Sequence, residues 1–162
     1  MTRAFLFAVS AVLFAAGCGP SQAPVSSEAA APASAIEIHD PWTAPTPGGV
    51  EVSAGYLEIA NSASADDRVV GVSSPRAARV EIHEMSMDGG VMRMRAVEGG
   101  LSAPAGSRVA LAPGGLHLMF FGVTQPFVEG ESIPVTLTFA NAGDIEVSLA
   151  VRRPAVGAHS VH

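Results

Sequence analysis

Methionine and histidine side chains gather in one stretch of this chain, between residues 83 and 119. Five of the six methionines and two of the five histidines lie there. Thioether sulfur and imidazole nitrogen are ligands that suit Cu(I), a soft and polarisable ion. A single methionine in a strand more often fills a gap in the core. The co-occurrence predicts a metal site in this stretch, although Met87 and Met92 are expected to serve in packing or at the rim of the site. The residues of the cluster are Met85, Met87, Met92, Met94, Met119, His83 and His117.

The alternation of side chains along β-strands indicates which of these groups can meet. In the expected strand 79–85, valine and isoleucine occupy one face, and His83 lies on the opposite face with Met85. In the expected strand 116–123, His117 and Met119 share a face and lie about 7 Å apart along the strand. Two ligands from one strand can therefore close on a single ion.

A hairpin turn signal, Asp88-Gly89-Gly90, connects the first of these strands to the segment 91–96. Pairing through this turn brings Met94 or Met92 back towards His83. Three strands could thus deliver two imidazoles and two thioethers to one place. This neutral set favours monovalent copper, whereas Zn²⁺ sites usually contain cysteine or carboxylate.

The elements that must position these residues are short β-strands separated by Gly- and Pro-containing turns. No amphipathic helix is predicted, and residues 42–49 are expected to be irregular because three prolines between 41 and 47 remove ladder donors. The pattern predicts an all-β antiparallel sandwich of about eight or nine strands. The expected strands are 36–39, 54–60, 68–73, 79–85, 91–96, 107–111, 116–123, 133–140 and 144–152.

The N-terminal segment has the composition of an export signal. Residues 1–17 combine Arg3 with an apolar run that is too short to span a membrane, followed by small residues before Cys18. This ending resembles a bacterial lipobox, although a typical one has leucine where Ala15 stands. We expect lipid attachment at Cys18 and a location in the periplasm or on the outer face of a bacterial membrane. The alternative is an ordinary signal peptide that releases a freely soluble protein.

The remaining chain divides into a linker, one domain and a tail. Residues 18–35 are rich in Pro, Ala and Ser and are expected to form a flexible tether. Residues 36–154 are the expected sandwich domain, and residues 155–162 are an expected disordered tail. Two tail histidines, His159 and His162, are candidate Cu(II) ligands, and a tail without metal is the alternative.

Charge and cysteine content exclude several classes of protein. Removing residues 1–17 leaves eight arginines, no lysine and fifteen carboxylates, a net charge of −7 with neutral histidines. This balance argues against nucleic acid as a partner and leaves a lipid anchor as the expected contact with the membrane. The domain has no cysteine, which excludes a blue-copper electron carrier. No G-x-S-x-G or H-E-x-x-H motif occurs, and we expect no enzymatic activity.

The segment H-E-M-S-M-D-G-G-V-M-R-M-R, followed by L-A-P-G-G-L-H-L-M-F-F-G, resembles the PCuAC family of periplasmic copper chaperones, the former DUF461 family. Ten residues separate His83 from Met94, as in the family motif. Twenty-two residues separate Met94 from His117, one more than the usual spacing. The resemblance covers about residues 36–154 and includes the opening P-W-T-A-P-T-P and the A-G-Y-L-E-I segment.

This resemblance implies a cupredoxin-like Greek-key β-sandwich and an exposed Cu(I) site formed by His83, Met94, His117 and Met119. Met85 is the additional candidate ligand. The resemblance also implies delivery of copper for cytochrome c oxidase (Cu(A)) assembly, with cytochrome c oxidase subunit II and Sco-type copper proteins as partners. We expect the protein to be a monomer. Two alternatives stay open: a copper buffering or resistance protein without a specific acceptor, and a lipid-anchored adhesion domain in which the methionines are incidental.

Overall fold

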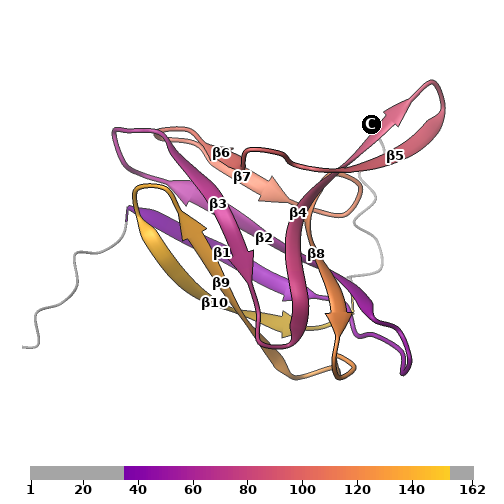
Figure 1. Ribbon diagram of the computed structural model, residues 1–162. Coiled ribbons are helices and arrows are strands. Elements are labelled where there is room, and N and C mark those ends of the chain that lie inside the picture. Colours follow the sequence, from indigo (N-terminus) through magenta and orange to yellow (C-terminus); the bar gives the residue numbers. More distant parts are fainter. Residues whose placement is uncertain (1–34, 154–162) are drawn as a thin grey trace, which may run out of the picture. The chain divides into compact units, whose positions relative to one another are not determined.

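The computed structural model describes residues 35–153, which form ten β-strands. Within this range no helix could span a membrane. The predicted export signal, linker and tail, with Cys18, His159 and His162, lie outside the described residues. The strands, shown in Figure 1, are β1 (Ile36–Thr43), β2 (Val52–Asn61), β3 (Asp67–Ser73), β4 (Ala77–Asp88), β5 (Val91–Ala96), β6 (Leu101–Ala103), β7 (Arg108–Leu111), β8 (Leu116–Val123), β9 (Ser132–Phe139) and β10 (Gly143–Val151).

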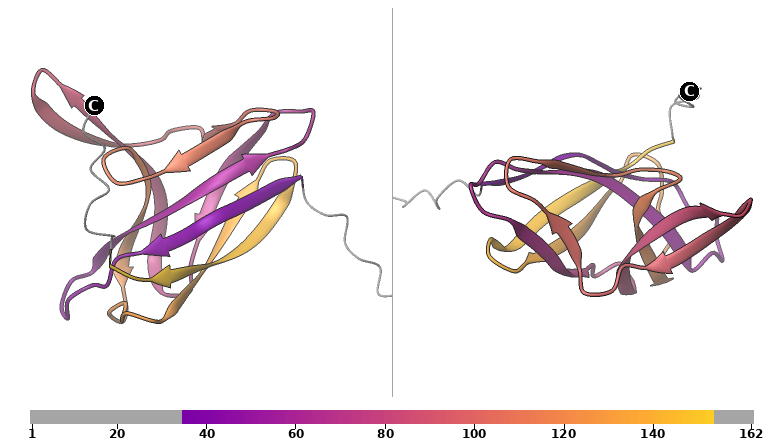
Figure 2. Two further views of the ribbon diagram at one scale, coloured as in Figure 1. Left: turned by 180° about the vertical axis from the view of Figure 1, so that it is seen from behind. Right: turned by 90° about the horizontal axis from the view of Figure 1, so that it is seen from above.

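Hydrogen-bonded neighbours follow the order β5-β4-β8-β2-β1-β10-β9-β3-β6, and β7 pairs with β2. The pairs are antiparallel except β1 and β10, which run parallel. This path bends round until β3 approaches β4 (Figure 1). Seen from above in Figure 2, the strands surround a flattened interior that the core side chains fill. The predicted all-β sandwich is confirmed, with one parallel pair that the sequence reasoning missed.

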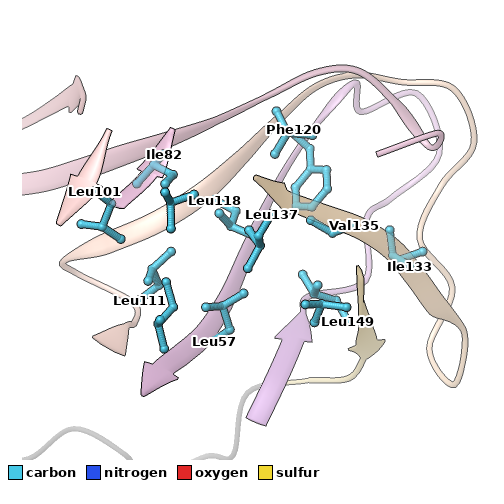
Figure 3. Packing of buried hydrophobic residues seen from close by; sticks show 14 of the residues in the cluster. Leu57, Ile82, Leu101, Leu111, Leu118, Phe120, Ile133, Val135, Leu137 and Leu149 are labelled. Atoms are coloured by element: carbon cyan, nitrogen blue, oxygen red, sulfur yellow. The ribbon is translucent and has the colours of Figure 1, made fainter. Parts of the chain in front are cut away.

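The core consists of apolar side chains from strands on both sides of the interior (Figure 3). Leu118 and Phe120 on β8 are fully buried, and Val80 and Ile82 on β4 are nearly so. These buried side chains fix which face of β4 and of β8 lies against the core, and the residues at the alternate positions must then face away from it. Burial of the apolar residues thus orients the intervening polar and sulfur-containing side chains.

Strand β1 differs most from its expected course. It continues through Pro41 to Thr43, whereas the prolines predicted irregular structure from residue 42. The register against β2 shifts between His39 and Trp42, so the missing N–H of Pro41 falls in an irregularity. Asp40 adopts φ 44° in this bulge, a left-handed conformation that aspartate tolerates better than most residues. Strand β6, only three residues long, was also not expected.

Candidate metal centre

Three neighbouring strands, β5, β4 and β8, place the predicted ligands on one side of the sheet. His83 on β4 pairs directly with His117 on β8, and Met85 on β4 pairs with Met94 on β5. Met119 lies two residues beyond His117 on the same face of β8. Directly paired residues and their neighbours at alternate positions share a face. All five candidates in the described range therefore point away from the core.

An open hollow of about 280 Å³ marks this side of the sheet. Met85, Met94, His117 and Met119 line it, whereas His83 lies beside His117 and does not contribute to the lining. The two imidazole ring centroids are 6.0 Å apart. This separation allows both rings to reach one ion, since metal–nitrogen bonds are about 2 Å long. The remaining lining residues are Val52, Ser53, Ala54, Tyr56 and Gly114.

The backbone fixes the orientation of the His117 ring. His117 is only 4% exposed, and its Nδ1 lies 3.0 Å from the carbonyl oxygen of Gly115. A carbonyl can only accept, so Nδ1 carries the proton of the neutral ring. The lone pair is then on Nε2, which is the nitrogen available to a metal. The loop before β8 thus prepares His117 as a ligand.

A carboxylate orients the second imidazole. His83 Nε2 lies 2.9 Å from Oε2 of Glu81, whose other oxygen bonds Arg79 Nε at 2.9 Å. The hydrogen bond from His83 lowers the pKa of the Glu81 carboxyl, and the charge of Arg79 acts in the same direction. With Nε2 donating to Glu81, the lone pair of neutral His83 is on Nδ1. This Nδ1 is buried and has no hydrogen-bond partner, an arrangement that suits a metal ligand.

The hairpin register differs from the simplest expectation for methionine. Met94 lies opposite Met85, and the residue opposite His83 is Ala96. Met94 is therefore a diagonal neighbour of His83, a separation that a long side chain can bridge. Met85 lines the hollow and is the direct cross-strand partner of Met94. Its position supports the expectation that Met85 is an additional ligand.

A metal ion in this hollow would need the methionine sulfurs among its ligands. Among residues 35–153, no group of three or more His, Cys, Asp or Glu side chains could hold a metal ion. Tyr56 lines the hollow, but burial raises the pKa of its phenol, so it offers no phenolate at neutral pH. Two imidazoles with thioethers form a neutral donor set. Such a set fits Cu(I) and is a poor fit for Zn²⁺.

Sequence reasoning did not assign roles to Glu81 and Tyr56. Glu81 could have been found, because it occupies the position two residues before His83 and so shares its face. Tyr56 comes from β2, whose pairing with β8 is not encoded in local spacing. Tyr56 also packs against Trp42 with ring centroids 4.6 Å apart. Tyr56 is thus the aromatic residue on the β2 side of the hollow, and Trp42 does not line it.

Replacement of Glu81 with glutamine tests the orienting role of this carboxylate. We expect Cu(I) affinity to fall about 10- to 100-fold, the usual effect of losing an outer-shell partner of a metal-bound histidine. The measurement is a competition titration with a chromophoric Cu(I) chelator. Glu84→Gln is the matched control, because Glu84 lies on the same strand but on the other face. Equal affinity in both variants would show that Glu81 does not orient His83.

Comparison with known proteins identifies the family. The family model for LpqE-like lipoproteins matches residues 36–151, and the chain belongs to this family. "Putative lipoprotein Lxx21020" from Leifsonia xyli subsp. xyli (strain CTCB07) is 34% identical over 131 residues, which cover 71% of this chain and 79% of that protein. The match spans the whole strand-forming region from β1 to β10.

Solved structures give the fold class. The copper-bound PCuAC domain from PmoF2 superposes with a TM-score of 0.63 at 29% identity, covering 74% of this chain and 94% of that domain. The Cu(I) form of DR1885 from Deinococcus radiodurans has a TM-score of 0.58 at 23% identity, covering 80% of this chain and 85% of that protein. The chain thus has the cupredoxin-like fold of PCuAC domains. The PmoF2 domain is copper-bound and the DR1885 structure is a Cu(I) form, so the comparisons group this chain with copper-binding domains rather than with an enzyme.

Proposed function

We propose that this protein binds Cu(I) through His83, Met94, His117 and Met119, with Met85 as an additional ligand. The observation that carries the proposal is the convergence of imidazole and thioether groups from three strands beside one open hollow. The unpartnered Nδ1 of His83 and the oriented ring of His117 support it. The similarity to a copper-bound PCuAC domain adds independent support.

The chemistry of the site suits transfer better than storage. Neutral ligands at an open hollow let an acceptor's thiolates replace them one at a time, because each step exchanges one donor for another on Cu(I). The proposed acceptor is the Cu(A) centre of cytochrome c oxidase subunit II, with Sco-type proteins as collaborators. This assignment rests on the resemblance of the motif from His83 to Met119 to PCuAC chaperones.

The proposed location is outside the cytoplasm, on a membrane. Membership of a lipoprotein family supports export and lipid attachment at Cys18. The proposed anchor is the only membrane contact, and the acidic composition argues against nucleic acid as a partner. A tethered domain is held near membrane-bound acceptors, which raises their effective concentration.

Deletion of the gene in cells grown at low copper separates delivery from buffering. We expect cytochrome c oxidase activity to fall and to recover when copper is added, because delivery matters most when copper is scarce. The wild-type gene should restore activity, and a gene that encodes Met94→Leu should restore it poorly. Unchanged oxidase activity, together with greater copper sensitivity, would favour the buffering alternative. Chelator competition with the purified protein determines whether copper binds at all.

A further inference from the structure

The tip of the β4–β5 hairpin extends beyond the rest of the sheet. Strand β4 pairs with β8 only as far as Glu84, opposite Leu116, and β5 pairs with β4 alone. Figures 1 and 2 show the resulting two-stranded ribbon projecting from the body of the sandwich. Its turn is well defined, since Gly89 and Gly90 adopt φ 58° and 79°, as a two-residue hairpin loop requires.

The ribbon has two chemically different faces. On one face, Met87 pairs with Met92, and Met85 pairs with Met94. We call these four residues the methionine ladder. The other face is mainly polar and includes an ion pair between Arg93 and Asp88 at 3.3 Å. Its cross-strand pairs are Glu84 with Arg95, Ser86 with Arg93 and Asp88 with Val91.

Core packing does not explain the outer pair of the ladder. Met87 is 71% exposed and Met92 is 61% exposed, so neither side chain fills a gap in the core. Sequence reasoning had left these residues as packing or rim, and the exposures exclude packing. A large apolar side chain that stays in contact with water contributes little to the stability of the fold, because its surface is not buried. Two directly paired thioethers in this setting indicate a ligand-binding role.

The ladder leads from solvent to the His83–His117 pair. Successive rungs on a strand are two residues apart, which is about 7 Å. The outer rung is Met87–Met92, the inner rung is Met85–Met94, and the next pair along β4 and β8 is His83–His117. Each methionine has three rotatable side-chain bonds, so neighbouring rungs can share an ion during a transfer.

We propose that Met87 and Met92 form a second, weaker Cu(I) site that loads the inner site along the methionine ladder. Binding at this pair stands on its own register and exposure, whereas the loading role rests on the proposed function. In each transfer a Cu(I)–sulfur bond breaks as a bond forms to another thioether sulfur or to an imidazole nitrogen of the inner site. No proton or electron moves, because thioethers are neutral and copper remains Cu(I). The weaker affinity follows from having two thioethers without imidazole.

Methionine methyl spectra test the proposal residue by residue. The protein, labelled with ¹³C at methionine methyl groups, is titrated anaerobically with Cu(I) alone. The Met94 and Met119 signals should shift with the first equivalent, and those of Met87 and Met92 with the second. In the double variant Met87→Leu and Met92→Leu, stoichiometry should fall from two to one, and stopped-flow loading of the inner site should slow several-fold. Ser86→Ala, on the polar face, is the control.

The two proposals fail in distinguishable ways. If the Met87 and Met92 signals stay unchanged through several equivalents while Met94 and Met119 respond, the outer site does not exist. If Met87 and Met92 respond but Met94 and Met119 do not, the outer site stands and the proposed inner site is wrong. An unchanged loading rate in the double variant would remove the loading role. Leucine at these exposed positions should leave the thermal unfolding temperature unaltered, which verifies folding.

Discussion

The variant His117→Ala is expected to lose Cu(I) affinity by about 100-fold or more, because even outer-shell partners of a metal site contribute 10- to 100-fold. His117 is the residue that connects the parts of the site. It pairs directly with His83, lines the hollow with Met94 and Met119, and has its ring fixed by the Gly115 carbonyl. Its removal leaves thioethers and a single imidazole that does not line the hollow.

Two measurements check this expectation. Chelator competition gives the affinity, and thermal unfolding gives a second readout, since a ligand at 100 times its Kd stabilises the folded state by about 2.7 kcal/mol. Copper should therefore raise the unfolding temperature of the wild-type protein much more than that of the variant. His39→Ala on β1 is the matched control and should behave as wild type. Stoichiometric, tight binding by His117→Ala would show that the site assignment is wrong.

Local sequence patterns were sufficient to predict the face on which each candidate lies. The alternation of Val80 and Ile82 with His83 on β4 holds in the structure, as does that of Leu118 with His117 and Met119 on β8. The physical reason is that burial of one set of side chains orients the other. The hairpin register was also within reach, since a two-residue loop at Gly89-Gly90 requires Met94 to lie opposite Met85.

Long-range pairing could not be predicted in the same way. The match of His83 with His117 joins strands separated by β5, β6 and β7, and its register depends on how the whole core packs. The parallel pairing of β1 with β10 joins the two ends of the domain. The course of β1 through Pro41 depends on a bulge, and no local rule places that bulge there. These features are set by tertiary packing, which single-residue propensities do not contain.

Solvent exposure of the methionines was the least predictable feature. Met87 and Met92 continue the alternation of β4 and β5, so their pattern alone fits packing as well as ligation. The pairing of β4 with β8 stops at Glu84, so within the described chain no neighbouring strand covers Met87 and Met92. The sequence pattern does not contain this information. The sequence therefore predicted which ligand types gather here, but it did not predict that the Met87–Met92 pair is exposed.

The variant Phe120→Ala is expected to lower the free energy of unfolding by about 3–5 kcal/mol, the range for deleting a fully buried phenylalanine. Phe120 is 0% exposed and meets the Phe127 ring edge-on with centroids 5.5 Å apart. Figure 3 shows it among aliphatic side chains that include Val135 and Leu137 of β9. Gly55 cannot fill the space left behind, because it has no side chain; a Cβ there would lie 2.9 Å from the Phe120 ring.

This variant also tests how the core supports the metal site. Phe120 lies between Met119 and Phe121 on β8, so a cavity beneath the strand should loosen the face that carries His117. We expect denaturant unfolding at a lower midpoint and Cu(I) binding that is weaker but still stoichiometric, because every ligand remains. Val128→Ala is the control, since Val128 is 56% exposed and its truncation should change stability by at most about 0.5 kcal/mol. A fully stable Phe120→Ala protein would mean that β8 is held by its hydrogen bonds alone, and the rigidity of the site would then need another source.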